Sequence, residues 1–416
     1  MKSATKLGCF AIAILLALQA SIVLANNLRE QVLRDAAKRA GLVPADATHV
    51  SVDDKLVAAG KLLFQSKKMS LDHETACATC HVDRFGSADG IPNAIGTEGH
   101  GEGVERLLAG GDIIPRNTLP FWGRGGVGFD VFFWDGKVDK SSGTVVSQFG
   151  DLNPSDDPLV VAAHLPPVEI GEMVTDSKDN EPLKTENVST AAAVYDQLLD
   201  RLLKDDEINS ALVAATGKSA NEIEFLDVAS AIAAFIRDNF KLQSTRFHDF
   251  VFADGKMSER ENAGGLIFYG KARCSTCHNG AYFSDLEFHA VPFPQSGFGK
   301  NGFGVDYGRF NVTLNPDDRY RFRTPPLFNV SKTAPYSHSG SIMKLGDAIR
   351  VHVDPFAVYD PSRMSAVQRA EYYQALKVWS DEPLVGVTLD DAEIDALTAF
   401  LRTLEFDSAS PVQVSD

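Results

Sequence analysis

Two short motifs of cysteine and histidine carry the clearest chemistry in this sequence. Cys77–His81 reads C-A-T-C-H and Cys274–His278 reads C-S-T-C-H. This spacing is the attachment signature of c-type haem, in which two thiols bond the haem vinyl groups and the next imidazole binds the iron. A zinc knuckle or a thioredoxin-like redox pair also uses C-x-x-C. Two matches, with only Cys9 left over, favour two covalent haems attached through the thiols of Cys77, Cys80, Cys274 and Cys277.

The first 25 residues have the pattern of a secretory signal peptide. Lys2 and Lys6 precede an apolar run from Phe10 to Leu24, and we expect cleavage near Ala25. The run is short for a membrane span, and no other stretch is long and apolar enough to be one. Cys9 would be removed with this leader. Haem attachment after export suits a bacterial periplasm, so we predict an exported, periplasmic protein without a membrane span.

Charge narrows the choice of partners. The formal net charge is −16, and loss of Lys2 and Lys6 with the leader would make it −18. An acidic chain of this kind is poorly suited to nucleic acid or to anionic membrane surfaces. It is compatible with a basic protein partner, although acidic charge is also ordinary in exported proteins.

The elements around the motifs are expected to be mainly α-helical. Apolar residues recur at helical spacing, which predicts helices over Leu28–Leu42, Asp54–Gln65, Ala191–Leu203, Glu224–Leu242, Glu259–Tyr269, Lys344–Val351 and Thr388–Leu404. The stretch from Arg84 to Val131 is rich in glycine and lacks periodicity, which indicates a long loop.

Each half of the chain repeats one order of features. A helix, a haem motif, a long irregular stretch and a second helix follow one another, and Ala231–Arg237 resembles Ala396–Arg402. This order predicts two tandem cytochrome c-like domains, each with one covalent haem that replaces much of the core a small domain needs. We divide the chain into a signal peptide (1–25), an N-terminal domain (26–240) and a C-terminal domain (241–416).

Several further motifs, in order around the two C-x-x-C-H sequences, resemble bacterial dihaem cytochrome c peroxidases and their MauG relatives. The resemblance covers roughly Asp54 to Phe406. Its landmarks are Gly60–Phe64, Gly99–Gly101, Arg116–Thr118, Phe133–Lys137, Gly171–Met173, Phe283–Asp285, Asp306–Arg309 and Thr333–Gly340.

The resemblance implies that the first haem carries out peroxide chemistry and the second stores and delivers an electron. His81 would then be the proximal ligand of the first iron, and His100, in a Gly-His-Gly loop, a distal ligand that leaves on activation. Glu172 matches the catalytic carboxylate of the family, with Glu169 as its nearby competitor. Gln148 matches a pocket amide, although the segment between Trp134 and Glu172 is longer than the family pattern.

The resemblance also places Trp134 between the haems, where an indole relays electrons or simply packs. Asn117, Thr333 and Pro335 match positions that bind an interdomain calcium ion in the family, and oxygen donors suit that cation. The implied cofactors are therefore two covalent haems and one calcium ion.

The sixth ligand of the second haem departs from the family pattern. In the family it lies fourteen residues after the histidine that His338 matches, and it is methionine in the peroxidases and tyrosine in MauG. This count lands on His352. With His278 as proximal ligand we therefore expect bis-histidine ligation, with Met343 as the alternative sixth ligand. If His352 is not a ligand, it is an ordinary histidine on the face of a helix near Asp354.

These inferences leave three functions open. The first is a periplasmic peroxidase that reduces hydrogen peroxide with electrons from a small redox protein, a cytochrome c or a cupredoxin. The second is a MauG-like enzyme that oxidises side chains of a partner protein. The third is a non-catalytic electron-transfer cytochrome. Assembly as a homodimer is compatible with all three.

Overall fold

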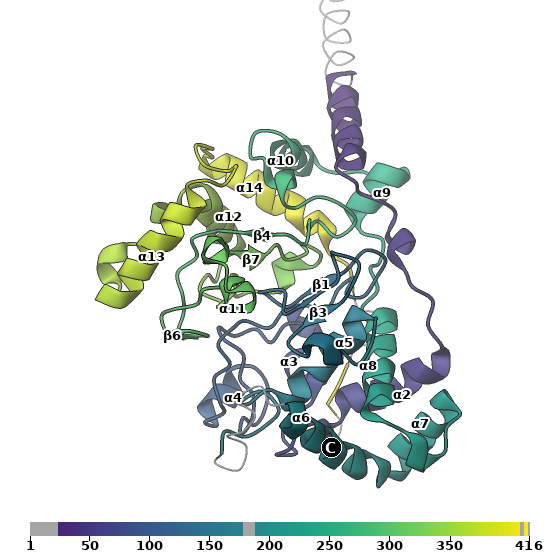
Figure 1. Ribbon diagram of the computed structural model, residues 1–416. Helices are drawn as coiled ribbons and strands as arrows, with labels where there is room; N and C mark the ends of the chain where they lie inside the picture. The colour runs from purple at the N-terminus through teal and green to yellow at the C-terminus, as the bar shows by residue number, and fades with distance from the viewer. Residues whose placement is uncertain (1–23, 178–187, 408–411, 415–416) are drawn as a thin grey trace, which may run out of the picture.

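The computed structural model describes residues 24–177, 188–407 and 412–414, and the predicted signal peptide lies mostly outside these ranges. The chain is mainly helical, as predicted (Figure 1). A first helix covers residues 24–39. The others are α2 (Asp54–Gln65), α3 (Cys77–Cys80), α4 (Val104–Leu108), α5 (Pro158–His164), α6 (Val188–Leu203), α7 (Asp206–Thr216), α8 (Phe225–Asn239), α9 (Arg246–Phe252), α10 (Glu259–Tyr269), α11 (Phe310–Thr313), α12 (Leu345–Val353), α13 (Ala366–Trp379) and α14 (Asp391–Leu401).

The strands are short and form three small antiparallel sheets. β1 (Val131–Phe132), β2 (Val138–Asp139) and β3 (Val146–Ser147) make a meander in which Val131 pairs with Asp139 and Val138 with Ser147. The two-stranded sheets pair β4 (Phe288–His289) with β7 (Phe322–Arg323), and β5 (Phe298–Gly299) with β6 (Gly302–Phe303). No helix among the described ranges has the length and apolar character needed to cross a bilayer.

The two halves are built around the same close helix crossing. In the first half, a Cβ at Gly60 of α2 would lie 1.9 Å from the carbonyl oxygen of Ala231 in α8. In the second half, a Cβ at Gly264 of α10 would lie 2.0 Å from the carbonyl oxygen of Ala396 in α14. Only glycine allows the two backbones to approach this closely. The crossing therefore explains why α8 and α14 have similar sequences, Ala231–Arg237 and Ala396–Arg402.

A similar pair of packed aromatic rings accompanies each helix crossing. One turn after each glycine, Phe64 and Phe268 are fully or almost fully buried. The ring of Phe64 lies 5.1 Å from that of Phe235, at 53°, and the ring of Phe268 lies 5.1 Å from that of Phe400, at 49°. Tilted ring pairs at this distance are favourable beyond the apolar area they bury. The duplicated core supports two tandem domains of one architecture.

Each end of the chain packs on the opposite half. The helix of residues 24–39 lies beside α9 and α10 in Figure 1, and its fully buried Leu33 contacts Gly265. In the other direction, Phe406 packs edge-on against Trp122 with the ring centroids 4.8 Å apart. The division at residue 240 stays a proposal, and in space the first helix belongs with the second half.

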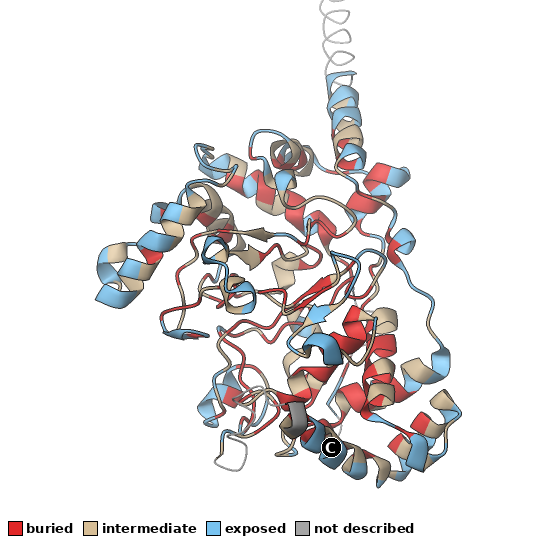
Figure 2. Ribbon diagram, viewed as in Figure 1, coloured by how far each residue is buried: buried red, intermediate tan, exposed pale blue. Residues whose placement is uncertain are grey.

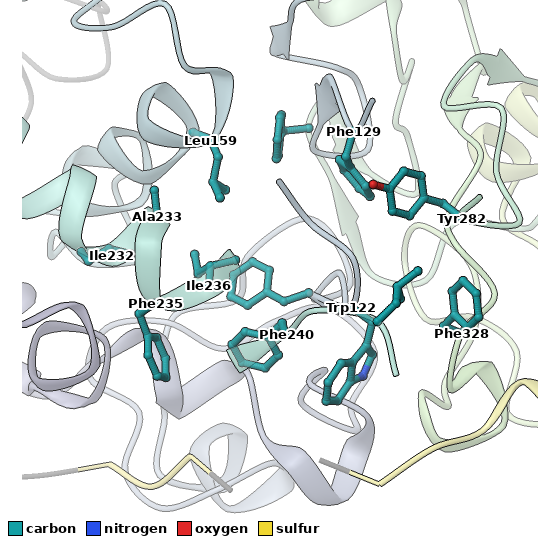
Figure 3. Packing of buried hydrophobic residues seen from close by; sticks show 14 of the residues in the cluster. Trp122, Phe129, Leu159, Ile232, Ala233, Phe235, Ile236, Phe240, Tyr282 and Phe328 are labelled. Carbon is teal, nitrogen blue, oxygen red and sulfur yellow. The ribbon is translucent and has the colours of Figure 1, made fainter. Parts of the chain in front are cut away.

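The halves also share one cluster of buried apolar residues, and Figure 2 shows buried residues in both halves. Figure 3 shows Phe129 of the first half beside Tyr282 of the second, and their ring centroids are 5.1 Å apart. The hydroxyl group of Tyr282 donates to the carbonyl of Val127 at 2.7 Å. Apolar packing and this hydrogen bond therefore join the two halves.

Candidate functional site

The first cysteine motif forms a single helical turn that presents its histidine to a cavity. α3 begins where the backbone N–H of Ala76 donates to Oγ1 of Thr79 at 2.9 Å. Nδ1 of His81 donates to the carbonyl of Ser87 at 2.9 Å, which directs Nε2 away from the backbone. Cys77, Cys80 and His81 all line the cavity. Burial lowers the pKa of His81 to about 3, so its imidazole is neutral and able to bind a metal.

The second motif repeats this arrangement. The 3₁₀ turn Cys274–Thr276 leads into His278, whose Nδ1 donates to the carbonyl of Phe283 at 2.9 Å. Cys274, Cys277 and His278 line a second cavity. Burial lowers the pKa of His278 to about 4. In both motifs a backbone carbonyl selects the tautomer that a haem ligand requires.

Buried cations beside the cavities fit a cofactor that carries carboxylates. Arg124 lines the first cavity and Arg323 the second, with 7% and 1% of their surfaces exposed. Nε of Arg124 and Nη2 of Arg323 have no hydrogen-bond partner among the described residues. Burial lowers the pKa of both, and for Arg124 the charge of Arg323 adds to this effect. Because an unpaired buried charge is costly, the haem propionates would supply the missing anions.

The second cavity contains a further imidazole in the predicted place. His352 of α12 lines it, and the ring centroids of His278 and His352 are 6.5 Å apart. Metal–imidazole bonds of about 2 Å place the ring centroids of two trans imidazoles roughly 6 Å apart. Nδ1 of His352 donates to the carbonyl of Ala348 at 2.8 Å, so Nε2 is available. Met343 is 64% exposed and does not line the cavity.

The first cavity offers carboxylates in place of a second imidazole. Glu169 and Glu172 both line it, with Lys137 and Lys300. Nζ of Lys137 lies 3.3 Å from Oε2 of Glu169, and Nζ of Lys300 lies 3.4 Å from Oε1 of the same residue. Glu169 is thus held between two ammonium groups, one from each half of the chain. No ion pair or hydrogen bond joins the Glu172 carboxylate to another described side chain.

These surroundings separate the pKa values of the two acids. Burial raises the pKa of Glu172 to about 7, and the negative charge of Glu169 adds to the rise. Burial also opposes ionisation of Glu169, but Lys137 and Lys300 outweigh it and hold its pKa at about 2. At neutral pH, Glu169 is therefore ionised, whereas Glu172 can both accept and release a proton. This difference favours Glu172 over its competitor as the proton-transfer group.

Trp134 contacts both cavities, and its position between two haems stays a prediction. Its side chain lines both of them, and its indole Nε1 donates to the carbonyl of Asn117 at 2.9 Å. Its own carbonyl accepts the N–H of Arg323 at 2.8 Å. The indole is therefore fixed by the first half and the backbone of Trp134 by the second half, whichever of the two roles the indole has.

The predicted calcium residues meet at the same seam. Nδ2 of Asn117 donates to the carbonyl of Pro335 at 2.7 Å, and Thr333 lies two residues before that proline. Oδ1 of Asn117 is buried without a partner among the described residues. Amide and carbonyl oxygens are the donors that Ca²⁺ prefers, and an unsatisfied buried oxygen fits such an ion. Calcium itself remains a proposal.

Two predicted residues lie away from the cavities. The His100 side chain is 62% exposed, and its Nδ1 lies 3.2 Å from Oε2 of Glu74. It does not line the first cavity, so the Gly-His-Gly loop would have to move for His100 to reach an iron there. Gln148 is exposed beside β3 and also lies outside the cavity lining. This arrangement does not bring His100 or Gln148 to the first cavity, and both roles stay predictions.

Sequence reasoning missed four cations that shape the sites: Arg124, Lys137, Lys300 and Arg323. Only Arg124, in the run Gly123–Gly125, and Lys137, in the landmark Phe133–Lys137, lay next to a recognisable pattern. Lys300 comes from the β5–β6 turn of the second half, far along the chain from Glu169. Local sequence carries no signal for a contact of this kind.

Comparison with known proteins agrees with the sequence motifs. Residues 54–256 match the family model of the di-haem cytochrome c peroxidases. The chain is 28% identical to the cytochrome c551 peroxidase of Pseudomonas aeruginosa over 299 residues, which cover 70% of each chain. It is 24% identical to the methylamine utilization protein MauG of Methylorubrum extorquens over 347 residues, which cover 80% of each chain.

Solved structures show the same fold. The diheme peroxidase BthA from Burkholderia thailandensis superposes with a TM-score of 0.62 at 20% identity, over 90% of this chain and 93% of that one. A MauG-like protein associated with microbial copper homeostasis also gives a TM-score of 0.62, at 22% identity, over 88% and 92% of the two chains.

Proposed function

We propose that this chain, whose residues 54–256 match the family model of the di-haem cytochrome c peroxidases, is a member of that family and reduces hydrogen peroxide to water with electrons from a small redox protein. It is an oxidoreductase of the cytochrome c peroxidase type. We further propose that it works in the periplasm after removal of the leader, and that the donor is a cytochrome c or a cupredoxin.

The observation that carries the proposal is the difference between the two cavities. In the second cavity, the rings of His278 and His352 lie at a distance that suits one metal between them. Among the described residues that line the first cavity, His81 is the one imidazole, and the carboxyl group of Glu172 lies there too. A site with two protein ligands suits electron transfer, whereas a site with one ligand and an acid–base group suits reaction with a small oxidant.

Proton transfer would be the task of Glu172. Splitting peroxide to water requires one oxygen to lose a proton and the departing oxygen to gain one. The ionised carboxylate of Glu172 accepts the first proton and, once protonated, donates it to the departing oxygen. A pKa near 7 keeps both forms populated at neutral pH. A haem bound by Cys77, Cys80 and His81 would supply the redox chemistry.

Other residues would position and protect these steps. Glu169, fixed by Lys137 and Lys300, keeps a negative charge beside Glu172. Trp134 fills the space between the two cavities, where an electron must pass. We retain His100 as a gate that binds the first site in the resting protein and lies outside it, as here, when the site is open.

The test is peroxide turnover by the holoprotein after reduction with one electron, followed through oxidation of a donor cytochrome. Glu172→Gln should lower the rate at least about 100-fold, because acid–base catalysis of this kind contributes that much, and should leave both haem spectra intact. Glu207→Gln, an exposed glutamate on α7, is the control and should keep full activity. Unchanged turnover in Glu172→Gln would remove this residue from the mechanism, and no turnover in any redox state would indicate an electron carrier.

A further inference from the structure

A third cavity lies in the second half, between α13 and the wall of the second haem site. Its volume is about 700 Å³, within the range of about 300–1,000 Å³ typical of sites for small organic molecules. We call it the α13 cavity. Its lining includes several aromatic rings and a few polar groups, among them Phe293, Tyr320, Phe322, Tyr359, Arg363 and Tyr372.

The α13 cavity is separate from the haem site. Cys277, His278 and His352 line the haem cavity and are absent from this one. The two share a wall in which the rings of Phe322 and His338 stack, 3.8 Å apart at 9°. An occupant of the α13 cavity would therefore lie one layer of side chains away from the second haem.

One polar group in this cavity lacks a partner. Tyr372 is the single residue of α13 classed as buried, with 4% of its surface exposed, while the rest of the helix is exposed or half-buried (Figure 2). Its hydroxyl group forms no hydrogen bond with any described residue, although Tyr372 lines the cavity. Buried tyrosine hydroxyls normally find a partner, because leaving them unpaired costs free energy. A ligand with a hydroxyl group would satisfy it.

The other two tyrosines present fixed ring faces. The hydroxyl group of Tyr359 donates to the carbonyl of Ser341 at 2.7 Å, and that of Tyr320 donates to Glu371. Both hydroxyls are used, so these rings are held as walls. Flat aromatic walls favour a flat aromatic ligand, which packs by offset or edge-on stacking.

Charge excludes an acidic ligand. Asp306 is paired with Arg116 at 2.9 Å, and Arg116 also pairs with Asp135 at 2.6 Å. Asp360 and Glu371 remain at the cavity, opposite a single cation, Arg363, which already lies 3.9 Å from Asp360. A carboxylate or phosphate would meet net negative charge here, whereas a neutral phenol would not.

We propose that the α13 cavity is a binding site for one small neutral phenol, with its ring between the aromatic walls and its hydroxyl group on Tyr372. A monohydric phenol is protonated at neutral pH, like the tyrosine side chain itself, and both donates and accepts a hydrogen bond. This inference does not depend on the peroxidase reaction.

Equilibrium dialysis of the holoprotein against 4-fluorophenol tests the site without turnover. We expect saturable binding of one molecule per chain. Tyr372→Phe keeps the ring but removes one buried hydrogen bond, so it should weaken binding about fivefold. Tyr373→Phe, on the same helix with 51% of its surface exposed, should bind like the parent. Ala375→Trp, which adds bulk to the lining, should weaken binding.

Two controls keep the result decisive. Tyr372→Phe removes an unpaired hydroxyl group, so without ligand it should unfold at the same temperature or higher, which separates weak binding from misfolding. Neither 4-fluorobenzoate, an anion, nor glucose, a neutral polyol, should bind. Absence of 4-fluorophenol binding, equal binding by all variants, or preference for either of these two probes would overturn the proposal and leave the peroxidase assignment untouched.

Discussion

Replacing Glu169 with glutamine should shift the pH dependence of the peroxide reaction towards acid. Glu172 must be ionised to accept a proton, so the rate of the parent protein should rise as pH increases through about 7. Its pKa lies above the ordinary value of 4.5, which corresponds to about 3 kcal/mol against ionisation. Burial is the larger cause and the charge of Glu169 the second.

The size of the shift follows from that second cause. In general, two like charges about 6 Å apart cost roughly 3 kcal/mol at an effective dielectric constant of about 20, or roughly two pKa units. Lys137 and Lys300 offset part of the charge on Glu169. We therefore expect Glu169→Gln to move the acid limb of the profile down by about one pH unit.

The assay is the second-order rate of peroxide consumption by the half-reduced protein between pH 5 and 9. Lys300→Met provides the opposite perturbation, because removing a cation raises the pKa of Glu172 and should move the same limb towards alkaline pH. Both haem spectra should stay unchanged. If the two variants shift the limb in the same direction, or neither shifts it, the electrostatic account of Glu172 is wrong.

Three further predictions concern the haem, the calcium ion and the helix crossing. His352→Gly should change the low-spin spectrum of one haem only, while Met343→Leu, at an exposed position, should leave both spectra as they are; an unaltered spectrum in His352→Gly would exclude it as a ligand. Chelation of calcium should lower the unfolding midpoint of the parent, because a ligand bound only to the folded state stabilises it, and Asn117→Ala should remove this response. Gly264→Ala should destabilise the second half by about 1–3 kcal/mol in denaturant unfolding, because its Cβ would meet the backbone of Ala396. In the control, Gly346→Ala in α12, the new Cβ would lie 3.4 Å from the nearest atom, which is ordinary van der Waals contact, so the change should be neutral or slightly stabilising. Equal effects of the two changes would contradict the close crossing.

Local sequence patterns predicted much of the helical structure. α2 and α10 have the predicted bounds, since apolar spacing and good capping residues at Asp53 and Ser258 act within a few residues of the chain. Of the helices longer than ten residues, α7 and α13 were not predicted. In α13 only Tyr372 is buried, so the helix has almost no apolar stripe for a periodicity argument to detect.

The motifs and the family resemblance likewise identified residues that line the cavities and lie close in sequence to a recognisable motif. Cys77, Cys80 and His81 come together because one helical turn joins them, and the count from His338 to His352 leads to an imidazole that lies opposite His278. The same reasoning selected His100 and Gln148, which lie outside the cavity lining. A loop motif records which residues are present, but not how far the loop lies from the site.

By itself, the amino-acid sequence determined the chemistry available to this protein: two sets of haem-binding thiols and imidazoles, and a carboxylate within a recognisable motif. The tertiary structure alone decided the electrostatics. Lys300 reaches Glu169 across 131 positions of the chain. Arg124 and Arg323 are brought near one another as buried cations, each with one nitrogen that has no hydrogen-bond partner among the described residues. The pKa of an acid depends on every charge and on the exclusion of water around it, and these are properties of the folded arrangement rather than of neighbours in sequence.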